Sequence, residues 1–108
     1  MFKTFPVIYV YLLAALCISR GLVVAQDVVI SEFMAVNVNS LTDEDGESSD
    51  WIELLNTTAS PIDLEGWSLT DDAAALTRWT FPEVMMGARA HLIVFASGKD
   101  RRDPAGEL

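Results

Sequence analysis

The stretch Asp50–Asp72, DWIELLNTTASPIDLEGWSLTDD, decides the fold of this chain. It opens with aromatic and branched residues at Trp51–Leu55, which favour a β-strand on a half-buried sheet. Because side chains alternate along a strand, Ile52 and Leu54 share one face, and we expect that face to point into the hydrophobic core. The turn-forming residues that follow end the strand, so we expect the chain to reverse direction soon after it.

Short strands are predicted on both sides of this stretch, with turns at close intervals. A polar loop is predicted at Asn37–Ser49, and Gly66 is expected to adopt a positive φ. Asp71 and Asp72 suit a turn held by side-chain-to-backbone hydrogen bonds, and Ala73–Leu76 is too short to form a helix alone. The other strands are expected at residues 28–34, 62–64, 67–70, 78–81 and 91–96, the last nearly all apolar, as where both faces are covered. This pattern indicates an all-β sandwich.

Several motifs together give the chain a resemblance to a known family. They are ISEFMA at Ile30–Ala35, DEDG at Asp43–Gly46, WIEL at Trp51–Leu54, D-L-x-G-W at Asp63–Trp67 and the pair Asp71–Asp72. The chain resembles the lamin-tail domain family, and the resemblance implies an immunoglobulin-like β-sandwich. Related members are typically secreted or surface proteins of bacteria, in which the domain is an accessory or interaction module.

The resemblance covers residues 26–108 of this chain and about the first two thirds of the family domain. Family members usually continue into further strands after the equivalent of Ala96–Arg101, and they commonly carry a Pro-Gly turn where this chain has Met85–Arg89. We therefore expect an incomplete sandwich, either because the chain is a fragment or because another chain completes it. Missing strands would leave apolar surface and unpaired strand edges.

Residues 1–25 indicate a helical signal peptide ahead of the domain. Lys3 supplies the positive start, and Val7–Ile18, VIYVYLLAALCI, is an apolar run shorter than the roughly 20 residues of a membrane-spanning helix. We expect cleavage after Ala25, and a secreted or cell-surface location follows from it. The alternative is an uncleaved membrane anchor, which Arg20 between the apolar run and the cleavage position favours.

Removal of the leader would make the remaining chain strongly acidic. Lys3 and Arg20 would leave while all 16 acidic residues stay, so the net charge becomes 5 − 16 = −11. Such a charge argues against a direct nucleic-acid partner, because binding to phosphates needs a basic surface. The expected partner is an unknown protein or surface polymer, with membrane contact only through an uncleaved leader. Cys17 lies in the leader, so no disulfide is expected in the domain.

The acidic run DEDGESSD at residues 43–50 is the strongest candidate for a metal site. Asp43, Asp45, Glu47 and Asp50 offer carboxylate oxygens, the ligands that Ca²⁺ prefers, and a glycine among them would let the loop fold sharply. The spacing is not that of an EF-hand loop. A weak Ca²⁺ site is therefore one interpretation, and a solvated acidic loop without any cofactor is the other.

No residue pattern in the chain indicates catalysis. His91 is the only histidine, stands in an apolar segment and is expected to be structural, and Glu53 is expected on the solvent face of its strand. The sequence contains no phosphate-binding loop, dinucleotide-binding fingerprint, nucleophile elbow or zinc motif. The pattern Asn56–Thr58 matches a glycosylation acceptor but more simply predicts a turn. The three tryptophans are expected to be core or sandwich-edge anchors rather than a ligand platform; they are Trp51, Trp67 and Trp79.

Two functional hypotheses follow from these observations. The first is a non-catalytic, exported β-sandwich module for binding or anchoring at the cell surface, or an accessory domain of a larger secreted protein. The alternative is the N-terminal piece of a longer exported enzyme, such as a nuclease, a phosphatase or a spore-coat-type kinase. The family resemblance leads to both, because such domains resemble those found beside these enzymes.

Overall fold

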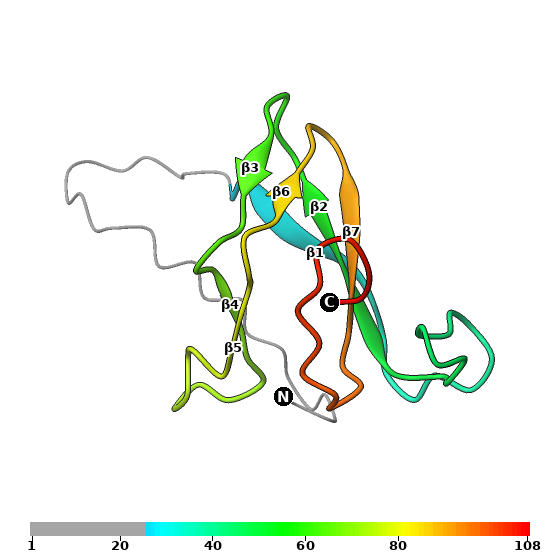
Figure 1. Ribbon diagram of the computed structural model, residues 1–108. Coiled ribbons are helices and arrows are strands. Elements are labelled where there is room, and N and C mark those ends of the chain that lie inside the picture. The colour runs from blue at the N-terminus through cyan, green and yellow to red at the C-terminus, as the bar shows by residue number, and fades with distance from the viewer. Residues whose placement is uncertain (1–25) are drawn as a thin grey trace.

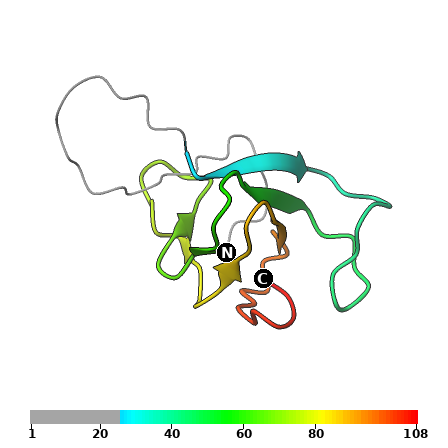
Figure 2. The ribbon, with the colours of Figure 1, turned by 90° about the horizontal axis from the view of Figure 1, so that it is seen from above.

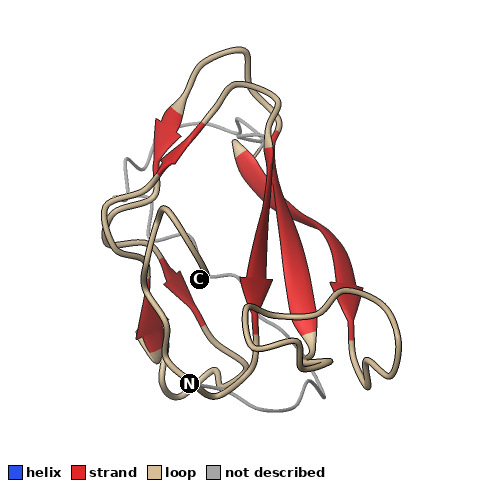
Figure 3. Cartoon of the chain, turned by 45° about the vertical axis from the view of Figure 1, so that its right-hand side comes forward, coloured by secondary structure: helices blue, strands red, loops and turns tan. Residues whose placement is uncertain are grey.

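The computed structural model describes residues 26–108, so the predicted signal peptide at 1–25 lies outside the described part of the chain. Within that part the chain forms strands and loops only (Figure 3), and no helix that could cross a membrane is present there. The strands are β1 (Val28–Met34), β2 (Trp51–Asn56), β3 (Ile62–Asp63), β4 (Ser68–Leu69), β5 (Trp79–Thr80), β6 (Met85–Met86) and β7 (His91–Phe95). The prediction of an all-β sandwich is confirmed.

The first layer is an antiparallel sheet with the strand order β1-β2-β7 (Figures 1 and 2). The central strand, β2, is the one predicted at the start of the fold-deciding stretch. Its Ile52 pairs with Phe33 of β1 and with Val94 of β7, so these three side chains lie on one face of the sheet. Val94 and Ile52 are fully buried there, whereas Phe33 is 60% exposed.

An irregularity in β1 explains how Phe33 reaches that face. Ile30 pairs with Leu54 and Glu32 pairs with Glu53, so β1 advances two residues while β2 advances one. An extra residue of this kind is a β-bulge, and it reverses the alternation of all later side chains in the strand. Ile30 and Phe33 therefore point to the same side, although their separation in sequence is odd.

The second layer is a twisted ribbon of two antiparallel arms. One end of the ribbon is the pair β3 and β6, and the other end is the pair β4 and β5 (Figures 1 and 3). Backbone hydrogen bonds join the two pairs: Leu64 donates to the carbonyl of Val84 at 2.9 Å, and Phe81 donates to that of Trp67 at 2.8 Å. The ribbon is thus one continuous element that faces the three-stranded sheet.

The hydrophobic core fills the space between the sheet and the ribbon. Ile52 and Leu54 lie in it, as the sequence predicted. Trp79 and Phe81 of the ribbon meet edge to face with ring centroids 4.7 Å apart, a favourable arrangement of aromatic rings. The core residues are Val28, Ile52, Leu54, Leu64, Leu69, Trp79, Phe81, Val84, Met86, Val94, Ala96 and Leu108.

The three tryptophans occupy three different environments. Trp79 is fully buried in the core, and Trp67 is partly buried against its edge. Trp51 is also buried, but it lies on the opposite face of β2, outside the main core and beside Phe95 of β7. All three are packing residues, which confirms their prediction as core or edge anchors.

Asn56, at the end of β2, is a buried structural residue. Its amide donates hydrogen bonds to the carbonyls of Ser60, Met86 and Gly87 at 2.8, 3.2 and 2.9 Å, and its side-chain oxygen accepts from the Thr58 backbone at 2.8 Å. The side chain therefore joins the turn after β2 to the turn after β6. Asn56 is fully buried, so its side chain holds the turn, as expected, and is not accessible as a glycosylation acceptor.

The predicted turns form with the expected local chemistry. Gly66 adopts a φ of 79°, which favours glycine. The Asp72 carboxylate accepts a hydrogen bond from the Ala74 backbone at 2.8 Å, and Thr70 accepts one from the Asp72 backbone at 3.0 Å. Arg78 adds ion pairs of 3.6 and 3.7 Å to the two aspartates of this turn.

Two local details differ from the sequence-based expectation. Met85–Met86 forms β6 by pairing with β3, and the turn begins only at Gly87, whose carbonyl accepts from Ala90 at 3.1 Å. β6 forms because its main chain pairs with β3, which is distant in sequence. The local residue types therefore do not predict this strand. In addition, β7 is not covered on both faces: only Val94 is buried, His91 is exposed, and the other three residues are partly exposed.

Candidate functional site

The β1–β2 loop, residues 35–50, projects from the end of the sheet (Figure 1, lower right). Its acidic half turns back towards the segment that follows β7, residues 97–108. That segment in turn lies against the outer edge of β7, because the backbone N–H of Phe95 donates to the carbonyl of Leu108 at 2.8 Å. The site is therefore built by two loops that are about fifty residues apart in sequence.

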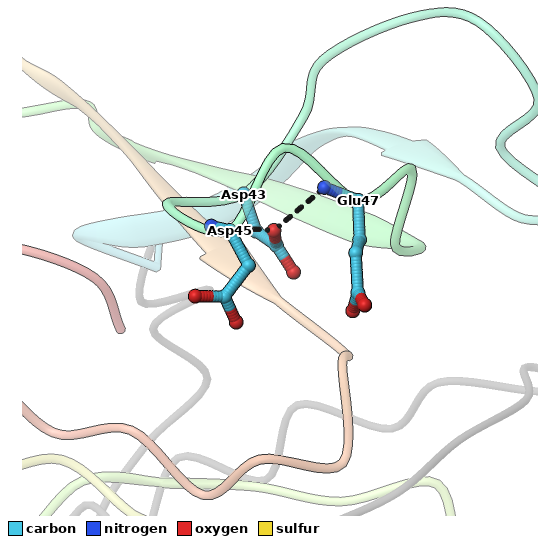
Figure 4. Close-up of side chains that lie close together, drawn as sticks. All are labelled: Asp43, Asp45 and Glu47. Atoms are coloured by element: carbon cyan, nitrogen blue, oxygen red, sulfur yellow. Dashed lines mark hydrogen bonds between the residues drawn. The ribbon is translucent and has the colours of Figure 1, made fainter.

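Asp43 organises the acidic half of the loop. Its side-chain oxygen Oδ1 accepts backbone N–H groups from Asp45 at 3.0 Å and from Glu47 at 2.9 Å (Figure 4). Its other oxygen, Oδ2, accepts the hydroxyl of Ser49 at 3.1 Å. Gly46 has a φ of 78°, so the chain can reverse within this short turn. The local sequence thus folds around one buried carboxylate.

Three of the four predicted metal ligands come together in this turn. Carboxylate oxygens of Asp43, Asp45 and Glu47 all lie within 4.8 Å of one another (Figure 4). The fourth, Asp50, is elsewhere, because its carboxylate accepts the backbone N–H of Asn37 at 3.0 Å. The ammonium group of Lys99 lies among the three carboxylates, at 2.6, 2.6 and 2.9 Å from their oxygens. A Ca²⁺ ion would have to displace this built-in cation.

Arg101 and Glu107 extend this cluster. The guanidinium of Arg101 lies 2.6 Å from Asp45 and 3.0 Å from Glu107, and it also approaches Glu44 at 3.8 Å. Glu107 accepts the backbone N–H of Glu44 at 2.9 Å. We call the whole group the charged clasp; its members are Asp43, Glu44, Asp45, Glu47, Lys99, Arg101 and Glu107. Five carboxylates face two cations, so the clasp keeps an excess charge of 2 − 5 = −3.

The clasp shifts the pKa values of Asp43, Asp45 and Lys99 towards their charged forms. Burial opposes ionisation of Asp43, but hydrogen bonds from Lys99, Glu47, Ser49 and Asp45 outweigh it and lower the pKa to about 2. Hydrogen bonds from Lys99 and Arg101 lower the pKa of Asp45. Hydrogen bonds to its carboxylate partners raise the pKa of Lys99. All these groups are therefore ionised at neutral pH.

A cavity of about 410 Å³ opens beside the clasp. Its apolar side consists of β7 and the chain end, and its polar side consists of the acidic loop and Glu107. One oxygen of Glu107, Oε1, is buried and has no hydrogen-bond partner among the described residues. The residues that line the cavity are Thr42, Asp43, Glu44, Leu92, Ile93, Phe95, Gly106, Glu107 and Leu108.

Comparison with known families decides what kind of domain carries this site. The sequence matches the family Lamin Tail Domain over residues 24–107, which is most of the chain. The chain belongs to the lamin tail domain family. This family has an immunoglobulin-like fold and is generally non-catalytic, in agreement with the strand-only sandwich described above. Comparisons with curated proteins and with solved structures returned no match.

The end of β1 and the first half of the β1–β2 loop expose several large apolar side chains. Five large apolar side chains are exposed in the described part of the chain, and four of them lie within nine residues: Phe33, Val36, Val38 and Leu41, with Met85 apart from them. Val36 is 81% exposed and has a φ of 60°, a backbone conformation that branched residues rarely adopt. We call residues 33–41 the apolar segment.

A second polar group lies on the outer face of the sheet. Glu53 accepts a hydrogen bond from the Ser31 hydroxyl at 2.7 Å and is 2.8 Å from Nδ1 of His91. These two neighbours lower the pKa of Glu53. The carboxylate stands between the serine and the histidine, so the histidine does not contact the hydroxyl as a general base would. The arrangement fits a structural polar contact across the strands, which was not predicted from the sequence.

Sequence reasoning located the acidic loop but not its partners. The spacing of acidic residues points to a cluster, whereas Lys99, Arg101 and Glu107 reach it only through the fold. A signal was present in the sequence, since the run Lys99–Asp103, KDRRD, places three basic and two acidic residues shortly after the last strand. That run could have been matched to the acidic loop by charge alone.

Proposed function

We propose that this lamin tail domain is a non-catalytic module that is exported and binds or anchors at the cell surface, alone or as the accessory domain of a larger secreted protein. The observation that carries the proposal is the apolar segment, residues 33–41, with its four exposed large side chains. Soluble monomers rarely expose such side chains close together unless the surface binds something. The proposed contact surface is therefore the end of β1 together with the first half of the β1–β2 loop.

The rest of the loop supports this role, because it holds the apolar segment in place. Asn37 is buried and its amide donates to the carbonyls of Leu41 at 2.6 Å and Ser49 at 2.9 Å. Asp50 accepts the backbone N–H of Asn37 at 3.0 Å. The apolar segment is thus tied to the acidic half, which the clasp fixes in turn. A surface ordered before binding loses less entropy when its partner arrives.

The strained backbone at Val36 supports the same role. A non-glycine residue at positive φ costs free energy, and such residues gather at ligand-binding sites. A branched apolar side chain that is exposed in this conformation gives no packing energy to the isolated domain. Its benefit would come from contact with a partner.

Export is supported by the sequence of residues 1–25, which has the charge and the apolar run of a bacterial signal peptide. The partner proposed here is a protein or a surface polymer. A net charge of −11 after removal of the leader disfavours nucleic acid as a direct ligand, because 16 acidic residues would stand against 5 basic ones.

The proposal is tested by the location of the full chain in a bacterial host and by its retention there. Cells that produce the tagged chain are separated into medium, washed cells and cytoplasm, and the N-terminus of the exported product is sequenced. We expect a product that begins at Gln26 and remains on washed cells or in the medium. A chain confined to the cytoplasm would sink the exported role.

The contact surface is tested by a variant with the substitutions Phe33→Ser, Val36→Asn, Val38→Thr and Leu41→Thr. We expect retention on washed cells to fall severalfold, because the apolar contact area is lost. Met85→Thr is the matched control, since Met85 is exposed but lies on the second layer. Equal retention of both variants and of the unaltered chain would assign the contact to another surface.

A further inference from the structure

We propose that the cavity beside the charged clasp binds a cationic group on an apolar stem, namely a lysine or arginine side chain of a protein partner. This inference rests on the proposed binding function and names the chemistry that one part of the surface recognises. The cavity lies between β7, residues 42–44 and residues 106–108. Residues 42–44 directly follow the apolar segment in sequence.

The charge of the site selects a cation. Asp43, Glu44 and Glu107 all line the cavity, and the clasp to which they belong keeps an excess charge of −3 after Lys99 and Arg101 are counted. A cavity lined by one sign of charge and low-dielectric walls concentrates the opposite charge. A second cation can therefore be held here in addition to the two built-in ones.

The unpartnered oxygen of Glu107 supplies a specific acceptor. The Glu107 side chain is only 2% exposed, and one oxygen, Oε2, accepts from Arg101 at 3.0 Å and from Glu44 at 2.9 Å. Its other oxygen, Oε1, has no hydrogen-bond partner within residues 26–108. A buried acceptor without a donor is costly, and a guest N–H group that shifts the Glu107 side chain enough to contact this oxygen recovers that cost.

The apolar side of the cavity distinguishes an organic cation from a metal ion. Leu92, Ile93, Phe95 and Leu108 contribute hydrocarbon, whereas Ca²⁺ takes six to eight oxygen ligands. The methylene stem of lysine or arginine packs well on such a surface while its head reaches the carboxylates. A volume of about 410 Å³ is also within the usual range of ligand pockets and exceeds what one metal ion needs.

The test is a nuclear magnetic resonance titration of the isotope-labelled full chain with n-butylammonium. We expect saturable shifts of the backbone amides of Thr42, Leu92, Ile93 and Gly106. n-Butanol, the neutral analogue, is expected to bind at least about tenfold more weakly, because it lacks the charge-assisted hydrogen bond. Equal binding of the alcohol, or shifts spread over the whole acidic surface, would overturn the proposal.

A capped Leu-Lys-Leu tripeptide separates a protein partner from a free amine. If the cavity takes a side chain from a protein, the peptide should bind severalfold more tightly than n-butylammonium, because its backbone and leucines bury additional surface that the free amine lacks. Binding no tighter than that of the free amine would overturn the assignment to a protein partner. Shifts caused by Ca²⁺ at Asp43–Glu47, with none caused by the ammonium ion, would replace the proposal by a metal site.

Variants test the role of the Glu107 carboxylate. Glu107→Gln keeps the shape and removes the charge, and we expect about a tenfold loss of n-butylammonium affinity. Glu65→Gln removes an exposed charge on the second layer and should change the affinity less than about twofold. Equal losses of n-butylammonium affinity in both variants would show that only the overall negative charge attracts the ion, and would overturn the proposal. If Glu107→Gln does not fold, the amide shifts of the unaltered chain with n-butylammonium and n-butanol still test the proposal. Cell-surface retention tests the proposed function in a separate experiment, so the two proposals can fail independently.

Discussion

The core of the sandwich and the charged clasp are held by different forces. In the core, side chains such as Ile52, Leu64 and Trp79 are fully buried between the sheet and the ribbon, and burial of apolar surface stabilises them. In the clasp, carboxylates of one loop are held by Lys99 and Arg101 of another. We therefore expect the core to respond little to salt and acid and the clasp to depend on both.

The core and the charged clasp therefore hold different parts of the molecule in place. The core fixes the strands, and no part of the proposed contact surface is needed for it. The clasp fixes the β1–β2 loop, which carries the apolar segment and borders the cavity. A change in the clasp should therefore loosen the loop and leave the sandwich folded, while a change in the core should unfold both.

The largest effect is expected for Trp79→Ala. This substitution leaves a cavity at the centre of the core and removes the edge-to-face contact with Phe81, so we expect a loss of about 3–5 kcal/mol in the free energy of unfolding. Denaturant unfolding followed by circular dichroism measures it. Trp67→Ala is the matched comparison, because Trp67 is only partly buried and should cost clearly less. Equal losses of stability in the two variants would contradict the placement of Trp79 at the centre of the core and of Trp67 at its edge.

Acid should weaken the clasp before the core. The pKa of Asp43 is lowered from 3.8 to about 2 in the folded state. Its contribution to stability is therefore fully present above about pH 4 and is lost as the pH falls towards 2, because the unfolded state then binds the proton more readily. We expect the melting midpoint to fall in this window.

The variant Asp43→Asn makes this acid effect specific. It removes a carboxylate that accepts four hydrogen bonds, and we expect it to cost about 2 kcal/mol at neutral pH. Its midpoint should also depend less on pH between about 2 and 4 than that of the unaltered chain. An unchanged pH dependence would show that other carboxylates cause the acid response.

A smaller effect is expected from calcium, and it depends on Lys99. In the unaltered chain the ammonium fills the space between the three carboxylates, so millimolar Ca²⁺ should leave the melting midpoint unchanged. Lys99→Met leaves the carboxylates without that cation, and its midpoint should be lower and should rise with Ca²⁺. A calcium-dependent rise in the unaltered chain would instead support the Ca²⁺ site inferred from the sequence.

The smallest effect is expected for Val36→Gly. Glycine accepts a φ of 60° without strain, so we expect this substitution to raise the free energy of unfolding by up to about 1 kcal/mol. Val38→Gly is the control, because Val38 is 77% exposed, close to the value for Val36, but does not have a positive φ. A gain in stability together with weaker cell-surface retention would connect the strain at Val36 to binding.

The sequence predicted the strands of the first layer well, because the alternation around Ile52 and Leu54 and the apolar run of β7 are local signals, but it did not predict how they pair. It predicted the second layer less well, because β6 exists only through pairing with β3. The exposure of Phe33 on the core side of the sheet was also hidden, since a bulge reverses the alternation without any mark in the residue pattern.

The candidate site shows the same limit. Asp43, Asp45 and Glu47 are close in sequence and meet in one turn, as expected. Asp50 is almost as close in sequence, but its carboxylate is used by the Asn37 backbone. The cation in the cluster comes from Lys99, more than fifty residues away, and spacing within a loop contains no information about such a contact.

Hydrogen exchange followed by mass spectrometry tests the division between core and clasp most directly. Exchange rates in the full chain are compared at low salt and at about 1 M salt, where the Debye length falls to about 3 Å and charge interactions are weakened. We expect exchange to accelerate at residues 42–50 and 97–103, while the amides of β2 and β7 keep their protection. Equal acceleration in the loops and the strands, or no change in the loops, would contradict a clasp that charge holds independently of the core.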